Sequence, residues 1–299
     1  MKKLIYIFVF SFVFSVFAFG QETDSIAPKI NLTTIAQVSQ GESYITFPTD
    51  IGNIEPLVFE GNLNTNFFIR TSDDARLIGV LTAQILIRMY QEYSLPVRTP
   101  SYIPQITAYY RLTAKPNINS LSLMTRMAHH SNGQDGDFYL DNGEINTKSG
   151  NFSTNYVEFG LIKTNFNKQF NAAQFMSMSF EWHPQKLTDD DLIGKYSLYR
   201  WNTIFSIFKL PIEKISTKKK RANISLKGKS TWMFGDVNDW DFFSLERLNL
   251  SFTFFYHPNF LQDIGFFVQY YHGYDYYNIY FNEHRDMLRF GIMTEKLIF

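Results

Sequence analysis

The chain has 299 residues, equal numbers of acidic and basic side chains, no cysteine and an aromatic content of 18%. A net charge of zero argues against a nucleic-acid partner, because nucleic acids are bound largely through excess positive charge. Without cysteine, no disulfide can hold the fold together.

Residues 1–20 have the pattern of a secretory signal peptide. Two lysines precede an apolar stretch, and small residues follow it at the spacing expected for cleavage. We expect the mature chain to begin near Gln21 and residues 21 to about 42 to form a periplasmic lead-in. A retained N-terminal anchor is the alternative.

Beyond this segment, no uninterrupted apolar run is long enough for a membrane helix. Segments of about ten residues instead alternate polar and apolar side chains, which is typical of an all-β, transmembrane, antiparallel up-and-down β-barrel. Twelve strands are predicted, at residues 43–49, 63–72, 76–91, 103–113, 119–131, 151–165, 172–184, 196–210, 222–235, 244–257, 264–275 and 286–299. The terminal Phe299 resembles the assembly signal of bacterial outer-membrane barrels. A soluble β-sandwich is the alternative fold.

An even number of strands places both termini in the periplasm. The predicted extracellular stretches are then long and polar, at residues 50–62, 132–150, 185–195 and 236–243. The basic run 218–221 falls in a periplasmic turn, where it is most simply a solvated turn. An anionic-lipid patch is the other interpretation of that run.

His129 and Ser131 lie two residues apart in a predicted strand, and residues i and i+2 of a strand share a face. That face also carries Leu121, Leu123 and Met127, so a base and a hydroxyl are expected on the lipid-facing side at the extracellular end. A serine hydroxyl becomes a nucleophile when a neighbouring base takes its proton. The pattern predicts an enzyme that attacks lipids.

A third group is needed to hold the imidazole in one tautomer. The next predicted strand supplies Asn155 at the same depth and on the same outward face. An uncharged amide suits that place, because an unpaired carboxylate beside hydrocarbon would cost several kcal/mol. His130 is expected to point inward, and a one-residue shift in register would exchange the roles of His129 and His130.

The run from His129 to Gly133 reads His-x-Ser-Asn-Gly, and residues 151–155 form a loose Ser-x-x-Asn match. The segment from Ser94 to Gln105, and the stretch from Gly273 through Asn282 to Arg285, add further similarity. In these motifs the chain resembles the outer membrane phospholipase A family.

The resemblance implies a calcium-dependent hydrolase of phospholipid acyl esters in the bacterial outer membrane. Ser131 would be the nucleophile, His129 the base and Asn155 the group that orients the imidazole. The main-chain amide of Gly133 would help to stabilise the oxyanion.

The resemblance also implies calcium ligands and a partner. The carbonyl of Gln134 and the side chain of Asn151 match calcium ligands, although the family has a serine at the position of Asn151. Ser94 matches a ligand that a second subunit contributes, so the active form would be a homodimer.

The spacing departs from the family, since Ser131 and Asn155 are 24 residues apart, about twice the family's separation. The extra loop carries Asp135, Asp137, Asp141 and Glu144. It could supply calcium ligands or form a hairpin tip around Asn142-Gly143, and the tip is favoured.

Two other functions remain open. A lipid A deacylase also has a His-x-Ser pair on a barrel exterior with a nearby glutamate, for which Glu144 is the candidate, but such barrels have about eight strands. A porin or surface protein with a degenerate site would be a barrel without catalysis.

Overall fold

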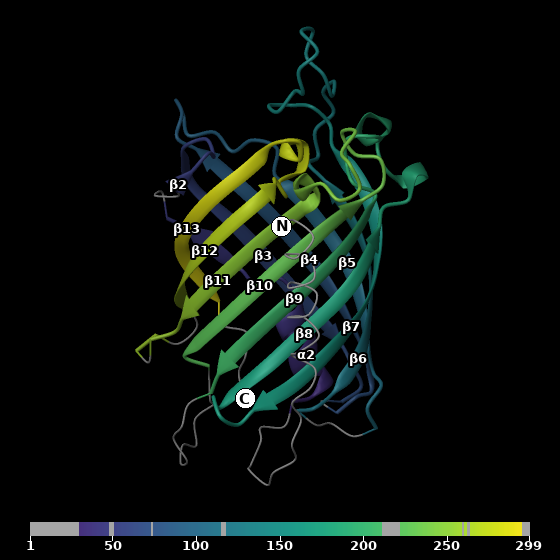
Figure 1. Ribbon diagram of the computed structural model, residues 1–299. Helices are drawn as coiled ribbons and strands as arrows, with labels where there is room; N and C mark the ends of the chain where they lie inside the picture. The colour runs from purple at the N-terminus through teal and green to yellow at the C-terminus, as the bar shows by residue number, and fades with distance from the viewer. Residues whose placement is uncertain are drawn as a thin grey trace.

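The computed structural model describes residues 30–47, 51–72, 74–114, 118–210, 222–258, 260–261 and 264–294. Most of them form one antiparallel sheet that closes into a barrel of strongly tilted strands (Figure 1). The strands are β1 (Tyr44–Thr46), β2 (Ile51–Gly52), β3 (Leu57–Ile69), β4 (Leu77–Tyr90), β5 (Ser101–Arg111), β6 (Leu121–Ser131), β7 (Ser153–Asn167), β8 (Ala172–Trp182), β9 (Tyr199–Lys209), β10 (Ile224–Phe234), β11 (Leu248–Tyr256), β12 (Ile264–Tyr274) and β13 (His284–Thr294). The signal segment, the basic run 218–221 and Phe299 lie outside the described residues.

The ring closes through the short strand β1, which pairs with β3 on one side and with β13 on the other. Strand β2 pairs with β13 nearer its beginning, so β1 and β2 together occupy one strand position. The barrel therefore has twelve positions, and the predicted fold class is confirmed.

One predicted boundary was wrong. β3 begins at Leu57, whereas residues 50–62 were expected to form a loop and the strand to start at 63. The polar side chains of Glu60 and Asn62, which favoured a loop, are buried and face the barrel interior. A bulge between Leu57 and Phe59 further disturbs the alternation.

The two faces of the barrel wall have opposite polarity. Large apolar side chains, such as Phe67, Met127 and Phe159, are more than half exposed on the outside. Charged side chains line the interior, among them Arg126, Glu158, Glu181, Arg200, Lys227 and Lys229. Apolar side chains outside and polar ones inside are the arrangement of a barrel whose outer surface meets lipid.

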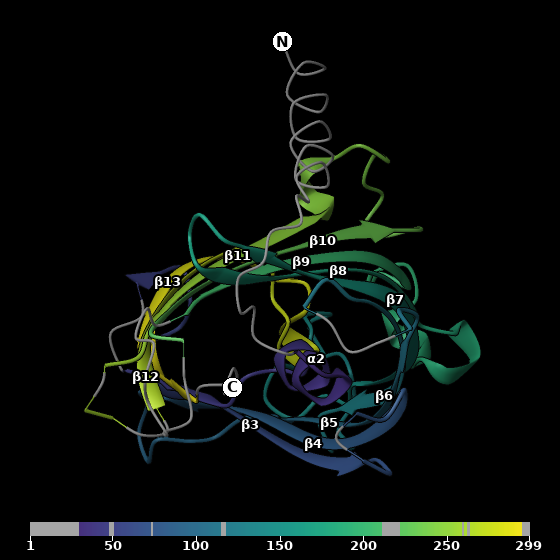
Figure 2. The ribbon, with the colours of Figure 1, turned by 90° about the horizontal axis from the view of Figure 1, so that it is seen from below.

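A short helix fills one end of the barrel. The described part of the expected lead-in forms helix α2 (Leu32–Ser39), capped by the Asn31 side chain. Seen along the barrel, α2 lies inside the ring of strands (Figure 2). Its apolar side chains pack on inward-facing residues such as Ile78 and Val80. None of the described helices is long and apolar enough to cross a membrane.

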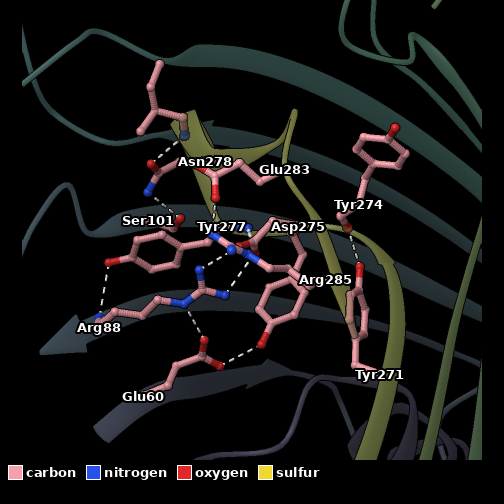
Figure 3. Close-up of polar contacts among 12 residues, drawn as sticks. Glu60, Arg88, Ser101, Tyr271, Tyr274, Asp275, Tyr277, Asn278, Glu283 and Arg285 are labelled. Atoms are coloured by element: carbon pink, nitrogen blue, oxygen red, sulfur yellow. Dashed lines mark hydrogen bonds and ion pairs between the residues drawn. The ribbon is translucent and has the colours of Figure 1, made fainter. Parts of the chain in front are cut away.

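The opposite end carries the long segments 132–150, 183–198 and 235–247, and we call it the loop end (Figure 1). A buried ion-pair network lies inside it. Arg88 Nε donates to Glu60 at 2.7 Å, and its two terminal nitrogens donate to Asp275 at 2.7 and 2.8 Å (Figure 3). Arg289 and Arg285 add contacts to Glu60 and Asp275, at 2.8 and 3.2 Å. These buried charges are therefore paired.

The connection between β12 and β13 folds back into the barrel mouth. The Tyr277 hydroxyl accepts from the Arg88 amide at 3.1 Å (Figure 3). It also donates to the Arg98 carbonyl at 2.9 Å. The Asn278 side chain donates to Ser101 Oγ at 2.9 Å. An apolar cluster surrounds these contacts, formed by Leu57, Leu86, Tyr90, Phe138, Phe152, Leu192, Tyr196, Tyr277, Ile279, Tyr280 and Phe281.

Candidate functional site

The predicted strand phase is correct for β6 and β7. His129 and Ser131 lie on the outward face of β6, while His130 is 8% exposed, contacts Phe152 edge to face and lines the interior. Asn155 lies directly opposite His129, and Ser153 lies opposite Ser131. The register places the three residues together on the outer wall, near the loop end.

A hydrogen bond joins His129 to Asn155. His129 Nδ1 and Asn155 Oδ1 are 3.0 Å apart, and Asn155 Nδ2 donates to the Leu187 carbonyl at 2.8 Å. Because a carbonyl can only accept, the Leu187 contact fixes the amide with its oxygen toward the imidazole. Nδ1 must then carry a proton, so in the neutral imidazole Nε2 is the nitrogen with the free lone pair. The pair therefore has the tautomer that a general base needs.

The segment 183–198 holds this arrangement in place at a second point. Thr154 Oγ1 bonds to His183 Nδ1 at 2.9 Å and to Thr188 Oγ1 at 2.9 Å, both buried. Burial lowers the pKa of His183 below its ordinary value, although a 2.7 Å contact with Glu181 opposes the shift. A neutral His183 can accept at Nδ1 from Thr154 and donate at Nε2 to Glu181, which fixes the start of the segment that carries Leu187.

Ser131 is the last residue of β6 and is partly exposed. No hydrogen bond joins its side chain to His129 in the part of the chain that the structure describes. The contact through which a base activates a serine is therefore not formed in this structure. Such bonds are often long in substrate-free enzymes. Gly133 follows with a φ of +67°, exposed and with no acceptor for its amide among the described residues. Its N–H is therefore available to a ligand.

An apolar groove of about 610 Å³ lies on the outer wall beside His129. It crosses β3 to β7 and ends against the 183–198 segment. Its lining is formed by Phe67, Leu81, Thr82, Ala83, Pro104, Gln105, Ile106, Met127, Ala128, His129, Asn155, Tyr156, Val157, Pro184 and Leu187. Most of this surface is hydrocarbon, and the imidazole stands at its edge.

Of the predicted calcium ligands, Asn151 has the most suggestive surroundings. Its Nδ2 donates to Asp189 Oδ2 at 2.7 Å, while its Oδ1 is buried and has no hydrogen-bond partner. A buried carbonyl oxygen without a donor is an unfilled acceptor, and the Asp189 carboxylate is bonded to the nitrogen of the same amide. Neutral and charged oxygens of this kind suit calcium. The residues at this point fit a hard divalent cation.

The other two predicted ligands are less closely connected. The Gln134 amide donates to Asn132 Oδ1 at 3.2 Å, and Asn132 also accepts from the Phe152 amide at 3.1 Å. These contacts hold Gln134 near the beginning of β7. Ser94 lies in the β4–β5 connection, exposed and with a φ of +67°, and no described hydrogen bond joins it to Gln134. Its assignment to a second subunit's calcium site stays a prediction.

The extra loop forms the predicted hairpin. Tyr139 and Ile145 pair, and the Gly143 amide donates to the Leu140 carbonyl at 2.8 Å. Glu144, the glutamate of the lipid A deacylase alternative, accepts from the Asn142 side chain at this tip. The side chain that bonds to His129 is that of Asn155. The loop carboxylates form no cluster of three within the part of the chain that the structure describes.

Sequence reasoning missed the contribution of segment 183–198, because nothing local marks the Leu187 carbonyl, the His183 anchor or the Asp189 carboxylate as parts of a site. The run of three aspartates at 189–191 was the available signal.

No protein-family model and no curated protein sequence matches the chain. Solved structures do match. Outer membrane phospholipase A from Escherichia coli is 12% identical, with a TM-score of 0.59 over 88% of this chain and 97% of that one. The Salmonella typhi enzyme, described as a dimer with bound calcium, is 12% identical, with a TM-score of 0.58 over 92% of this chain and 95% of that one. The chain thus has the barrel fold of outer membrane phospholipase A.

Proposed function

We propose that the protein is an outer-membrane phospholipase A that hydrolyses acyl esters of glycerophospholipids at Ser131. The observation that carries the proposal is the His129–Asn155 hydrogen bond on the outer wall, with the amide oriented by the Leu187 carbonyl. A barrel gains no stability from an imidazole placed against lipid, so a polar pair there favours a chemical role.

The proposed reaction follows from the positions of these groups. Ser131 Oγ attacks the ester carbonyl while His129 Nε2 takes its proton, and the imidazolium is stabilised by the Asn155 oxygen at Nδ1. The Gly133 amide donates to the carbonyl oxygen as negative charge develops there. His129 returns the proton to the departing lysophospholipid oxygen. Water then attacks the acyl-Ser131 ester while the imidazole takes its proton. His129 returns that proton to Ser131 Oγ as the acyl–oxygen bond breaks and the fatty acid leaves.

The apolar groove supports a lipid substrate. An acyl chain lying against Phe67, Leu81 and Met127 would bring its ester linkage to the edge where His129 stands. The substrate would arrive by diffusion within the outer leaflet and need not leave the membrane. Binding and chemistry would then share one surface.

Calcium is proposed as the cofactor. Asn151 Oδ1, with the carbonyl of Gln134, would hold it, and Asp189 is an added candidate that the sequence did not suggest. When bound, the ion supplies positive charge near the carbonyl oxygen. We also propose that the active form is a homodimer, in which Ser94 of one barrel completes the calcium site of the other. The Salmonella typhi enzyme, described as a dimer with bound calcium, supports the dimer and the ion, and the family resemblance supports the role of Ser94.

The test is a hydrolysis assay on the refolded chain in micelles containing a glycerophospholipid, with and without calcium. We expect a fatty acid and a lysophospholipid in equal amounts, with activity lost on chelation. Ser131→Ala should abolish release, whereas Ser153→Ala, which alters the directly paired outward serine, should preserve it. Release that persists in Ser131→Ala would refute the assignment of the nucleophile.

A further inference from the structure

A second group of potential ligands lies on the outer wall, away from the proposed catalytic site. His272 on β12 and His284 and Asp286 on β13 bring their ligand atoms within 4.8 Å of one another. Four strands separate β12–β13 from β6–β7 in either direction around the ring. The cluster is therefore on the opposite side of the barrel from Ser131.

The three side chains converge at close range. His272 Nδ1 lies 2.6 Å from Asp286 Oδ1, and His284 Nδ1 lies 3.7 Å from Asp286 Oδ2. The two imidazole rings are 4.8 Å apart at 75°. Their side chains are 37%, 32% and 52% exposed for His272, His284 and Asp286, so an ion could reach all three from outside.

The backbone under the cluster is firmly held. His272 and Asp286 are directly paired across the two strands. Asn53 Oδ1 accepts from the Asp286 amide at 2.8 Å, and Asn53 Nδ2 donates to the His284 carbonyl at 2.8 Å. The relative positions of the three side chains are thus set by the sheet before any ion arrives.

Structural hydrogen bonding accounts for His272 and Asp286 but leaves His284 unexplained. The His284 imidazole makes ring contacts with His272 and Tyr274 and lies 3.7 Å from Asp286 Oδ2, but it forms no hydrogen bond to any described residue. A second imidazole beside a histidine–carboxylate pair adds another nitrogen that can act as a metal ligand. Two imidazoles and one carboxylate form a ligand set for transition metals, whereas calcium prefers oxygen ligands alone.

We propose that His272, His284 and Asp286 bind one divalent transition-metal ion of the zinc class. Three protein ligands leave a fourth tetrahedral position, which faces outward and can take water or an oxygen of an anionic headgroup. The site is separate from the proposed calcium site in both position and donor chemistry.

The experiment is a calorimetric titration of Zn²⁺ into the refolded chain without a histidine tag, in detergent, with excess Ca²⁺ present. We expect one Zn²⁺ per chain, with affinity at least tenfold weaker in His284→Ala and in Asp286→Asn. Tyr270→Phe is the matched control, because it removes a hydroxyl 3.3 Å from Asp286 and no ligand atom. Its affinity should stay within twofold.

Two further measurements separate this site from others. Ser131→Ala should bind Zn²⁺ with the affinity of the unmodified chain, because Ser131 is on the other side of the barrel. Zinc binding is therefore tested independently of the proposed hydrolase function. Co²⁺ in place of Zn²⁺ should give the strong visible absorption of a four-coordinate site, and His284→Ala should lose it. Absence of saturable Zn²⁺ binding, or binding that both ligand variants retain, would overturn the proposal.

Discussion

Polar groups inside the barrel and those on its outer wall differ in how fully they are paired. Inside, Arg88 and Glu60 are 1% and 0% exposed and make ion pairs at 2.7 Å with each other and further pairs with their neighbours. Outside, His129 has one side-chain partner and Ser131 has none among the described residues. The interior contacts pair charges that are buried, whereas on the outer wall the Ser131 hydroxyl and one nitrogen of His129 have no partner among the described residues. The difference indicates which polar residues stabilise and which can react.

The largest expected effect distinguishes two adjacent histidines. His129→Ala should lower kcat for phospholipid hydrolysis by at least about 1000-fold, because the general base is lost. His130→Ala, on the inward face, should retain activity within a few fold once its folding is verified by heat-modifiable gel migration. Equal losses in the two variants would contradict the outward assignment of the base.

The interior network is tested by Arg88→Met. Removing the guanidinium leaves Glu60 and Asp275 buried with fewer partners, which should lower the free energy of unfolding by about 3–5 kcal/mol. Urea unfolding of the refolded barrel measures the change. The control Glu92→Gln removes an exposed partner of Arg98 and should change it by less than about 0.5 kcal/mol. A small effect of Arg88→Met would mean that the network is not a main source of stability.

Asn155 is proposed as a positioning residue, so its loss should be smaller than that of His129. Asn155→Ala should lower kcat about 100-fold with KM little changed, because the imidazole loses the oxygen that holds its Nδ1–H. Asn165→Ala, on the same strand near its other end, serves as control. A kcat that is unchanged in Asn155→Ala, or one that falls equally in Asn165→Ala, would contradict the positioning role.

The smallest effect concerns calcium. Asn151→Ala removes the unpartnered oxygen and should raise the calcium concentration for half-maximal activity about tenfold. Asn142→Ala, at the exposed hairpin tip, should leave that concentration unchanged. Calcium titrations of hydrolysis compare the two variants, and identical curves would exclude Asn151 as a ligand.

The sequence predicts the barrel and the outward pair because both depend on local alternation. The period of two in β6 and β7 places His129, Ser131 and Asn155 on one face, and antiparallel neighbours then bring them to one depth. The start of β3 was mispredicted because a charged residue such as Glu60 indicates a loop when the residues that pair with it in the interior are unknown. Those partners, Arg88 and Arg289, are 28 and 229 residues away.

Contacts across long sequence separations account for the rest of what was missed. Helix α2 is seated in the barrel by residues of many strands, and no local pattern predicts that packing. The Leu187 carbonyl, 32 residues from Asn155, decides which way the amide faces. A main-chain carbonyl leaves no mark in the sequence. A motif can therefore suggest the His129–Asn155 pair but cannot predict the orientation of the Asn155 amide.

The central claim, that Ser131 is a lipid-facing nucleophile, is tested most directly by covalent trapping. The refolded chain is incubated with a long-chain alkyl sulfonyl fluoride in the presence of calcium, and the adduct is mapped by mass spectrometry. We predict one label per chain on Ser131, strongly reduced in His129→Ala. A label on any other residue, or none in a protein that hydrolyses phospholipid, would contradict the account.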